Sequence, residues 1–417
     1  MCGQLTIPPS KSHTLRAILF AALASGTSHI QDYLPSPDSL AMIKAVTLLG
    51  ARVEINQNCL TVHGGKLSSP DEVIDCGNSG LVLRFIGAIA ALLPHYTILT
   101  GDASIRNNRP VKPLLDALTQ LGATAISSRG NDRAPMMIKG PITKGTATLD
   151  GSDSQPVSGL LIAGALAPHP IDLHVTNPGE KPWVDLTLDW FDRLGIKYQR
   201  TGYTHYRVEG NTQLAPFTYR VPGDFSSAAF PIAAALITNS ELTLHNVDMN
   251  DAQGDKAIIS ILQQMGARFT VGDQFLKVEK GCKLKGIKID INDFIDALPI
   301  LSVIGCFAEG TTELYNGAMA RNKESDRIFS IARELRKMGA NIEERLDGVI
   351  IHHSSLHGAE LESHSDHRIL FSLSVAALAA NGHTTIFGIE CGAKTIPNFY
   401  EDFLSIGAKF ERNSIRL

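Results

Sequence analysis

Six short segments of similar sequence recur along the chain at nearly constant intervals. They read LLGARVEI, QLGATAIS, RLGIKYQR, QMGARFTV, KMGANIEE and SIGAKFER, and their central glycines lie 68 to 73 residues apart. Such a period is typical of one supersecondary unit that has been copied. In each copy a helical pattern ends at the glycine, which tolerates the left-handed conformation of a helix end, and a β-rich run follows. The repeat predicts six units of mixed helix and strand, three in each of two domains.

The break between the two domains is expected at the segment YRVPGDFSSAAF. Pro222 and Gly223 interrupt regular structure there, ahead of the next helix. A second crossing is expected at the two prolines near the N-terminus, if the first strand pairs with the C-terminal half. A hinge of two crossings implies a cleft that opens and closes. The predicted domains are 11–222 and 1–10 plus 223–417, with the active site in the cleft between them.

Composition excludes several classes of protein. The 417 residues carry a formal net charge of −4, which argues against a nucleic-acid partner, because such proteins are normally basic. The apolar runs are too short to span a bilayer, and the first residues do not form a signal peptide. The six cysteines show no CxxC pair or His/Cys cluster, so we expect reduced thiols in a cytoplasmic protein without a membrane partner.

Cationic and hydroxyl side chains stand where apolar helices are expected to begin. In PPSKSHTLRA, Lys11, Ser12 and Arg16 open such a helix, whose free N–H groups and dipole favour an anion. For this trio alone, an ordinary helix cap is the simpler interpretation. Similar clusters occur in CGNSG (75–80 region), NNRP (107–110), DSQ (153–155), NKESDRI (322–328), SDHRI (365–369) and CGAKTIPNF (391–399). Asp296 stands inside the apolar segment FIDALPILSV, where a carboxylate needs a partner or a task.

Other common catalytic motifs are missing from the sequence. It contains no GxxxxGK[ST] phosphate loop, no strand-coupled GxGxxG and no HExxH. Nucleotide hydrolysis, dinucleotide redox chemistry and zinc hydrolysis therefore lack support.

Taken in order, these segments resemble the 5-enolpyruvylshikimate-3-phosphate synthase family of enolpyruvyl transferases over essentially the whole chain. The resemblance implies an α/β (α+β) fold: a two-domain inside-out α/β barrel, each domain made of three βαβαββ units with pseudo-sixfold symmetry. It also implies transfer of the enolpyruvyl group of phosphoenolpyruvate to the 5-hydroxyl of shikimate-3-phosphate, in the pathway to chorismate and aromatic amino acids. The resemblance implies neither a metal nor a cofactor. It also implies that the protein is a monomer and a target of glyphosate.

The resemblance implies a set of site residues. Those expected to hold shikimate-3-phosphate are Lys11, Ser12, Arg16, Ser154, Gln155, Trp183, Asp296 and Lys323. Those expected around phosphoenolpyruvate are Lys11, Asn78, Gly80, Arg109, Gln155, Arg327, Arg368 and Lys394. Those expected in catalysis are Lys11, Asp296, Glu324 and His367. Asp296 would act as base toward the 5-hydroxyl and Glu324 would move a proton at the methylene carbon, with Lys11 as the alternative proton donor.

Four positions depart from the family pattern, among them Met319, which stands where some members have an asparagine ligand. Asp153 stands where the first phosphate-binding serine is common, so that either Ser152 substitutes for it or the loop shifts. Glu180 and Trp183 stand where one branch has Ser and Tyr.

Two alternatives stay open. One is the sister enolpyruvyl transferase acting on UDP-N-acetylglucosamine, but SIRNNRP lacks the cysteine expected in the corresponding loop. The other is a non-catalytic anion-binding relative, which would have no need of the carboxylates at Asp296 and Glu324.

Overall fold

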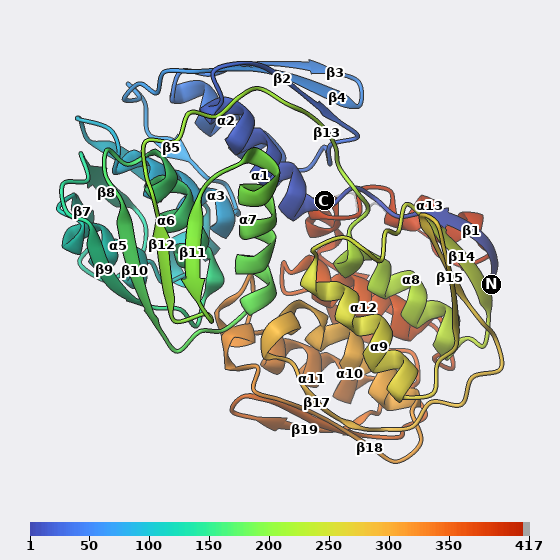
Figure 1. Ribbon diagram of the computed structural model, residues 1–417. Helices are drawn as coiled ribbons and strands as arrows, with labels where there is room; N and C mark the ends of the chain where they lie inside the picture. Colours follow the sequence, from blue (N-terminus) through green and yellow to red (C-terminus); the bar gives the residue numbers. More distant parts are fainter. Residues whose placement is uncertain (412–417) are drawn as a thin grey trace, which may run out of the picture.

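The computed structural model describes residues 1–411, which form two lobes joined along a seam (Figure 1). One hydrophobic core gathers buried side chains between Leu15 and Val221. A second core contains Leu5 and Ile7 together with side chains between Phe225 and Ala408. The predicted α/β class is therefore confirmed, while the exact domain boundaries stay a prediction.

The N-terminal lobe is built from three small sheets and their helices. Its helices are α1 (Lys11–Leu23), α2 (Pro37–Leu48), α3 (Gly80–Ala90), α4 (Ala103–Asn107), α5 (Lys112–Gln120), α6 (Ser154–Leu166) and α7 (Lys181–Leu194). Its strands are β2 (Gly26–Gln31), β3 (Arg52–Asn56), β4 (Cys59–Gly64), β5 (Ile74–Asp75), β6 (Thr97–Thr100), β7 (Thr124–Ser127), β8 (Met136–Lys139), β9 (Thr146–Asp150), β10 (Ile171–Thr176), β11 (Tyr198–Thr201), β12 (His205–Val208) and β13 (Thr218–Arg220).

The C-terminal lobe repeats this arrangement. Its helices are α8 (Phe225–Ile237), α9 (Ala257–Gln264), α10 (Leu298–Phe307), α11 (Arg327–Lys337), α12 (His367–Ala377) and α13 (Phe399–Ser405), with short 3-10 helices η1 (Gly254–Lys256), η2 (Asn292–Ala297), η3 (Ala318–Asn322) and η4 (Ile389–Lys394). Its strands are β1 (Cys2–Thr6), β14 (Glu241–His245), β15 (Phe269–Gly272), β16 (Phe275–Val278), β17 (Lys288–Asp290), β18 (Thr311–Tyr315), β19 (Asn341–Arg345), β20 (Gly348–His352), β21 (Glu360–Glu362) and β22 (Thr385–Phe387).

The four-stranded sheets share one strand order, which confirms the βαβαββ unit. In β5-β6-β8-β7 the first two strands are parallel and joined by α3, and the last two form an antiparallel hairpin on β6. The orders β9-β10-β12-β11 and β17-β18-β20-β19 repeat this pattern. Among residues 1–411 the sheets stay separate, and no closed β-barrel forms.

The first strand of the chain lies in the C-terminal lobe. β1 pairs in parallel with β14, while β13 pairs in parallel with β2 and completes the first unit of the N-terminal lobe. The two resulting crossings contact each other, since Ser10 N donates to Pro222 O at 2.7 Å and Asp224 N donates to Pro8 O at 2.9 Å. In Figure 1, β1 accordingly runs beside β14, although Cys2 and its partner Glu241 lie far apart in the sequence.

The sixth unit differs from the prediction. Its sheet consists of β21 and β22, and residues 408–411, which follow the repeat glycine Gly407, form no strand. Phe410 packs instead on aromatic side chains of α13, with ring centroids 5.5 Å from Tyr400 and 6.2 Å from Phe403. The remainder of that predicted run lies outside the described residues.

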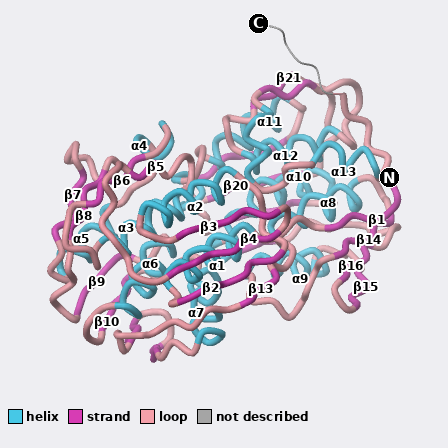
Figure 2. The backbone as a smooth tube through the Cα atoms, turned by 90° about the horizontal axis from the view of Figure 1, so that it is seen from above, coloured by secondary structure: helices cyan, strands magenta, loops and turns pink. Residues whose placement is uncertain are grey.

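The first helix of each unit is buried around its whole circumference. These inner helices are α1, α3 and α6 in one lobe and α8, α10 and α12 in the other. A helix that is apolar on all sides must lie inside. Strands β2, β3 and β4 form the upper edge of the molecule in Figure 1, and in Figure 2, which is seen from above, they lie over α1. Because the amphipathic helices and sheets cover these inner helices, the ends of the inner helices are the positions left for polar side chains.

Candidate active site

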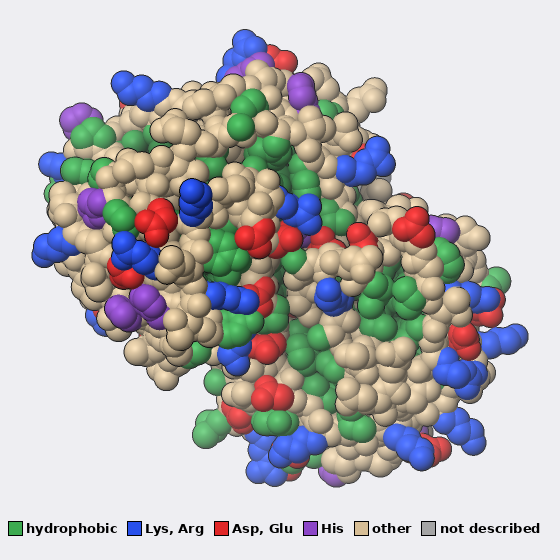
Figure 3. Space-filling view, in the orientation of Figure 1, with side chains coloured by type: hydrophobic (Ala, Val, Ile, Leu, Met, Phe, Trp, Pro, Cys, Tyr) green, Lys and Arg blue, Asp and Glu red, His purple; other side chains and the backbone are tan. Residues whose placement is uncertain are grey.

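The N-termini of the inner helices converge on the seam between the lobes. Five of them are capped by a hydroxyl or carboxylate: Ser10 for α1, Ser79 for α3, Asp153 for α6, Asp224 for α8 and Asp366 for α12. The sixth, α10, is preceded by η2, which carries Asp296. Each N-terminus contributes partial positive charge, so this seam favours anions before any side chain is counted. Figure 3 shows acidic and basic side chains gathered along it.

Lys394 ties the two lobes together at this seam. Its ammonium donates to Asn78 O at 3.0 Å and to Asn78 Oδ1 at 2.6 Å across the seam, and to Glu324 Oε1 at 2.7 Å in its own lobe. Arg109 Nη2 also reaches across and lies 3.1 Å from Glu324 Oε1. The structure therefore brings Asn78, Arg109, Glu324 and Lys394 together, as the sequence predicts.

Lys11 joins the same cluster through Asp38, which sequence reasoning missed. Lys11 Nζ lies 3.7 Å from Asp38 Oδ2, and Lys394 Nζ lies 3.8 Å from Asp38 Oδ1. Burial, followed by the Lys394 cation, lowers the pKa of Lys11 although Asp38 opposes the shift. Asp38 carries little local signal, because an acidic residue in the first turn of a helix looks like ordinary dipole compensation.

Two of the carboxylates that are predicted to be catalytic form ion pairs with Arg327. Its Nη1 is 2.6 Å from Asp296 Oδ1 and its Nη2 is 2.8 Å from Glu324 Oε2. Arg368 Nη2 lies 2.8 Å from the other oxygen of Asp296. Burial opposes ionisation of Asp296, but Arg368 and Arg327 outweigh it and hold its pKa well below the ordinary value. The pKa of Glu324 is likewise held low, because Arg109, Lys394 and Arg327 outweigh the effect of burial.

Arg16 lies apart from the ion pairs. Its guanidinium donates only to neutral oxygens, at 3.0 Å from Thr187 Oγ1, 3.1 Å from Trp183 O and 3.2 Å from Ser12 O. Burial lowers its pKa to about 9, so it remains charged at neutral pH. A buried cation without a carboxylate in contact among the described residues is suited to an anion brought by a ligand.

Asp153, one of the departures from the family pattern, has a cationic partner in the structure. Its carboxylate lies 3.0 Å from Arg84 Nη2 and accepts from Gln155 N at 3.0 Å, so its charge is neutralised. The hydroxyl of Ser152 donates to Asp150, and which of the two residues faces a phosphate stays a prediction. Arg84 was missed by sequence reasoning, although a lone arginine within an apolar helix is a signal that could have identified it.

Gly80 is closely surrounded by arginine side chains. A Cβ atom at this position would lie 2.5 Å from Arg109 Nη1 and 2.8 Å from Arg84 Nη1. The glycine therefore makes room for two arginine side chains. Gln155 contacts the same arginine, because its Oε1 accepts from Arg84 Nη1 at 3.1 Å.

Glu180 reaches across the seam to Lys323, with Oε1 2.5 Å from Lys323 Nζ. Its other oxygen accepts from both the backbone N and the hydroxyl of Ser154, each at 3.1 Å. Burial opposes the charge on Lys323, but Glu180 and Asp153 outweigh it and raise its pKa. Two predicted acceptor-site residues, Ser154 and Lys323, are thus brought together by a carboxylate that the prediction regarded as a departure.

His367 is buried beside the cluster. Burial and the nearby cations Arg368 and Lys11 hold its pKa well below the ordinary value, so the imidazole is neutral at neutral pH. Neither ring nitrogen has a hydrogen-bond partner among the described residues. The ring packs edge-on against Phe371 at 6.4 Å.

A further buried carboxyl group, that of Asp255 in η1, was not identified from the sequence. It is 3% exposed, and neither oxygen has a hydrogen-bond partner among the described residues. Burial and the neighbouring Asp296 raise its pKa well above the ordinary value, against the opposing effect of Arg368.

Replacing Asp255 should therefore change stability in a pH-dependent way. The unfolded chain releases this proton above about pH 4, whereas the folded chain retains it, so the wild type loses stability as pH rises toward the folded-state pKa. We expect Asp255→Asn to be about 1–3 kcal/mol more stable than wild type at pH 7.5, and the gap to shrink at pH 4.5. Urea unfolding at both pH values measures this; a gap independent of pH would contradict the burial argument.

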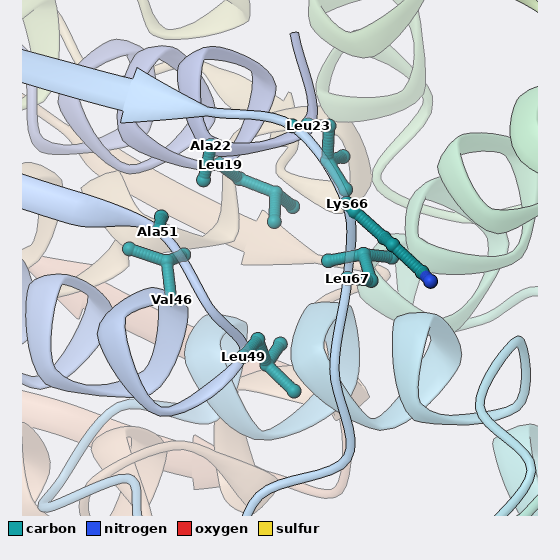
Figure 4. A pocket seen from close by; sticks show the side chains of 9 residues that line it. Leu19, Ala22, Leu23, Val46, Leu49, Ala51, Lys66 and Leu67 are labelled. Atoms are coloured by element: carbon teal, nitrogen blue, oxygen red, sulfur yellow. The ribbon is translucent and has the colours of Figure 1, made fainter. Parts of the chain in front are cut away.

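A small apolar pocket lies at the other end of α1, separate from the charged seam. It is lined by Leu19, Leu23, Val46, Leu49 and Leu67 among others, with Lys66 at its rim (Figure 4). Since α1 rises about 1.5 Å per residue, Leu23 lies about 18 Å along the helix from Lys11. The pocket is therefore not part of the ion-pair cluster.

Some features expected from the sequence can be checked directly. The six cysteines are free thiols, as predicted. Within residues 1–411, no group of three His, Cys, Asp or Glu side chains is arranged to hold a metal ion, and no helix is long and apolar enough to cross a bilayer.

Comparison with known proteins agrees with the sequence pattern. A family model described as EPSP synthase (3-phosphoshikimate 1-carboxyvinyltransferase) matches residues 1–403. A 3-phosphoshikimate 1-carboxyvinyltransferase of Acetivibrio thermocellus is 44% identical over 405 residues, covering 97% of this chain and 95% of the relative. One of Chlamydia felis is 43% identical over 415 residues, covering 99% and 93% respectively.

A solved structure of EPSP synthase from Acinetobacter baumannii is similar throughout. It superposes with a TM-score of 0.84 at 30% identity, covering 98% of this chain and 96% of that chain. The likeness therefore extends over both lobes and the seam.

Proposed function

The chain belongs to the EPSP synthase family, and we propose that the cluster at its seam binds phosphoenolpyruvate and shikimate-3-phosphate side by side. The reaction transfers the enolpyruvyl group of phosphoenolpyruvate to the 5-hydroxyl of shikimate-3-phosphate and releases phosphate. It is an addition followed by an elimination, on the pathway to aromatic amino acids.

The observation that carries the proposal is a cationic cluster drawn from both lobes. Lys11 and Arg109 come from the N-terminal lobe, and Arg327, Arg368 and Lys394 come from the C-terminal lobe. The two substrates bring about five to six negative charges, from two phosphates and two carboxylates. Binding would redirect these cations from the chain's own carboxylates to the substrates.

The residues divide into two subsites by the groups that they contact. Arg109, Arg327, Arg368 and Lys394 surround Glu324 and Asp296, beside Asn78 and Gly80, and we assign this part to phosphoenolpyruvate. Ser12, Arg16, Ser154, Gln155, Trp183 and Lys323 lie toward α6 and α7, and we assign this part to shikimate-3-phosphate. Lys11 stands between them.

The low pKa values of Asp296 and Glu324 explain why catalysis would require both substrates to be bound. Asp296 is a weak base while Arg327 and Arg368 hold its pKa low. Once an anionic substrate shares those cations, the pKa of Asp296 rises and the carboxylate can accept the proton of the 5-hydroxyl. Glu324 becomes a competent acid at the methylene carbon in the same way, while Lys11 remains the alternative proton donor. His367, neutral and with neither ring nitrogen hydrogen-bonded within residues 1–411, would hydrogen-bond and orient the substrate.

Phosphate release tests the function and the alternative acceptor together. We expect the chain to release phosphate from phosphoenolpyruvate with shikimate-3-phosphate and not with UDP-N-acetylglucosamine. The second acceptor is disfavoured because the loop around Arg109 has no cysteine. A coupled phosphate assay with each acceptor measures this, and turnover only with the UDP-sugar would reverse the assignment.

Further features follow as proposals from the same premise. The two hydrophobic cores would be domains 11–222 and 1–10 plus 223–417, which move about the paired crossings near Pro9 and Gly223. We propose a cytoplasmic monomer that glyphosate inhibits. Small-angle scattering with and without both substrates tests the hinge, and the absence of any compaction would count against it.

A further inference from the structure

Glu180 occupies a position built for an anion. Its side chain is 3% exposed, and its two oxygens receive a backbone N–H and a hydroxyl from Ser154 and an ammonium from Lys323. Ser154 is the first residue of α6, so the positive end of that helix also faces the carboxylate. A hydroxyl, a helix N-terminus and a buried cation are the groups that proteins use to bind phosphate.

Ser154 and Lys323 belong to the residues assigned above to shikimate-3-phosphate, and their donor groups are suited to its phosphate. Ser154 N, Ser154 Oγ and Lys323 Nζ are already satisfied by Glu180 at 2.5 to 3.1 Å. A phosphate and the Glu180 carboxylate cannot both accept from them, because the two anions would repel each other at contact distance.

The backbone holds Glu180 in this position by an unusual conformation. Its φ of 46° and ψ of 38° are left-handed, a conformation that is unfavourable for a residue other than glycine. The backbone is closely packed on both sides of Glu180. A Cβ atom at Gly179 would lie 2.8 Å from Ser152 O. Pro182 packs so closely on Gly254 that a Cβ atom at Gly254 would lie 2.1 Å from the proline ring. The side chain, rather than the loop, is therefore the part free to move aside.

We propose that Glu180 is an internal anion that fills the acceptor-phosphate subsite and bridges the two lobes, and that shikimate-3-phosphate binds by displacing it. Glu180 thereby sets the affinity for the phosphorylated acceptor. It has no such effect on an acceptor without phosphate, since that ligand does not compete for Ser154 and Lys323. This inference rests on the proposed function.

Calorimetric titration of shikimate-3-phosphate and of unphosphorylated shikimate tests the proposal. We expect Glu180→Gln and Glu180→Ser to bind shikimate-3-phosphate about 10- to 100-fold more tightly than wild type, because no charge-assisted hydrogen bonds have to be broken first. Binding of shikimate should change less than about threefold on the same scale. Asp185→Asn is the matched control: it removes one negative charge from α7, where Asp185 pairs with Arg200 at the surface, and should leave both affinities within about twofold.

The outcomes separate this inference from the function on which it rests. If both Glu180 variants bind shikimate-3-phosphate as wild type does, or more weakly, Glu180 is not a competitor and the proposal fails. A wild type that neither binds shikimate-3-phosphate nor releases phosphate with it would overturn the proposed function instead. Two variants of different size guard against a local packing defect, since displacement predicts tighter binding for both.

Discussion

Asp296→Asn should lower kcat for phosphate release by about 10²- to 10⁴-fold while both substrates still bind. The amide keeps the shape of the side chain and one acceptor oxygen, but it cannot take the proton of the 5-hydroxyl. Arg327 and Arg368 each lose a charged partner, so they are left freer to bind anions. Steady-state kinetics and calorimetric titration of each substrate separate the loss of chemistry from any loss of binding.

A control variant lies on the same 3-10 helix. Asp293 is in η2, three residues before Asp296, and forms no ion pair with the residues that the structure describes. Asp293→Asn should keep kcat within about threefold of wild type, since Asp293 is half-buried and lies outside the ion-pair cluster. If Asp296→Asn retained wild-type turnover, its role as base would be refuted, and a non-catalytic role for the cluster would regain support.

Arg327→Met should lower the free energy of unfolding by about 3–5 kcal/mol, the largest stability effect that we expect from a single change here. Arg327 is 1% exposed and contacts three carboxylates, at 2.6 Å for Asp296 and 2.8 Å for Glu324 and Asp366. Asp366 is fully buried, and the substitution would remove its arginine partner. The three carboxylates raise the pKa of Arg327 against the opposing effect of burial, so the guanidinium keeps its charge in the folded protein.

Urea unfolding of Arg327→Met beside Arg321→Met isolates the effect of burial. Arg321 also contacts two carboxylates, at 2.7 Å for Asp326 and 3.0 Å for Glu344, but its side chain is 26% exposed. Solvent screens such pairs, so we expect a loss of about 1 kcal/mol or less. Equal losses in the two variants would contradict the view that Arg327 neutralises carboxylates that water cannot reach.

Much of the fold could be predicted from the sequence because its signals are local. The glycine repeat marks where each second helix ends, and the Ser or Asp before an apolar run marks where an inner helix begins. Ser10, Ser79 and Asp224 cap helices in the structure as these signals indicate. The one repeat segment that failed, at Gly407, is the one whose following aromatic residue packs on a neighbouring helix instead of entering a sheet.

The candidate site was predictable only in part. Lys11, Asp296, Glu324, Arg327, Arg368 and Lys394 stand in recognisable segments, and the structure brings them together. Asp38, Arg84 and Asp255 were missed because each resembles an ordinary residue of its own element. Arg84 belongs to the site because the folded chain brings Asp153 within 3.0 Å and Gln155 within 3.1 Å of its guanidinium.

The sequence by itself determined the repeated unit, the inner helices and the charged side chains at their N-termini, because helix caps and apolar periodicity act over a few residues. Only the tertiary structure decided which charges meet. The pairing of β1 with β14, the pairing of β13 with β2 and the contact of Lys323 with Glu180 link residues more than a hundred positions apart. Coulomb attraction between two charges depends on the distance between them in the folded chain. The residues next to each charge in the sequence do not determine that distance.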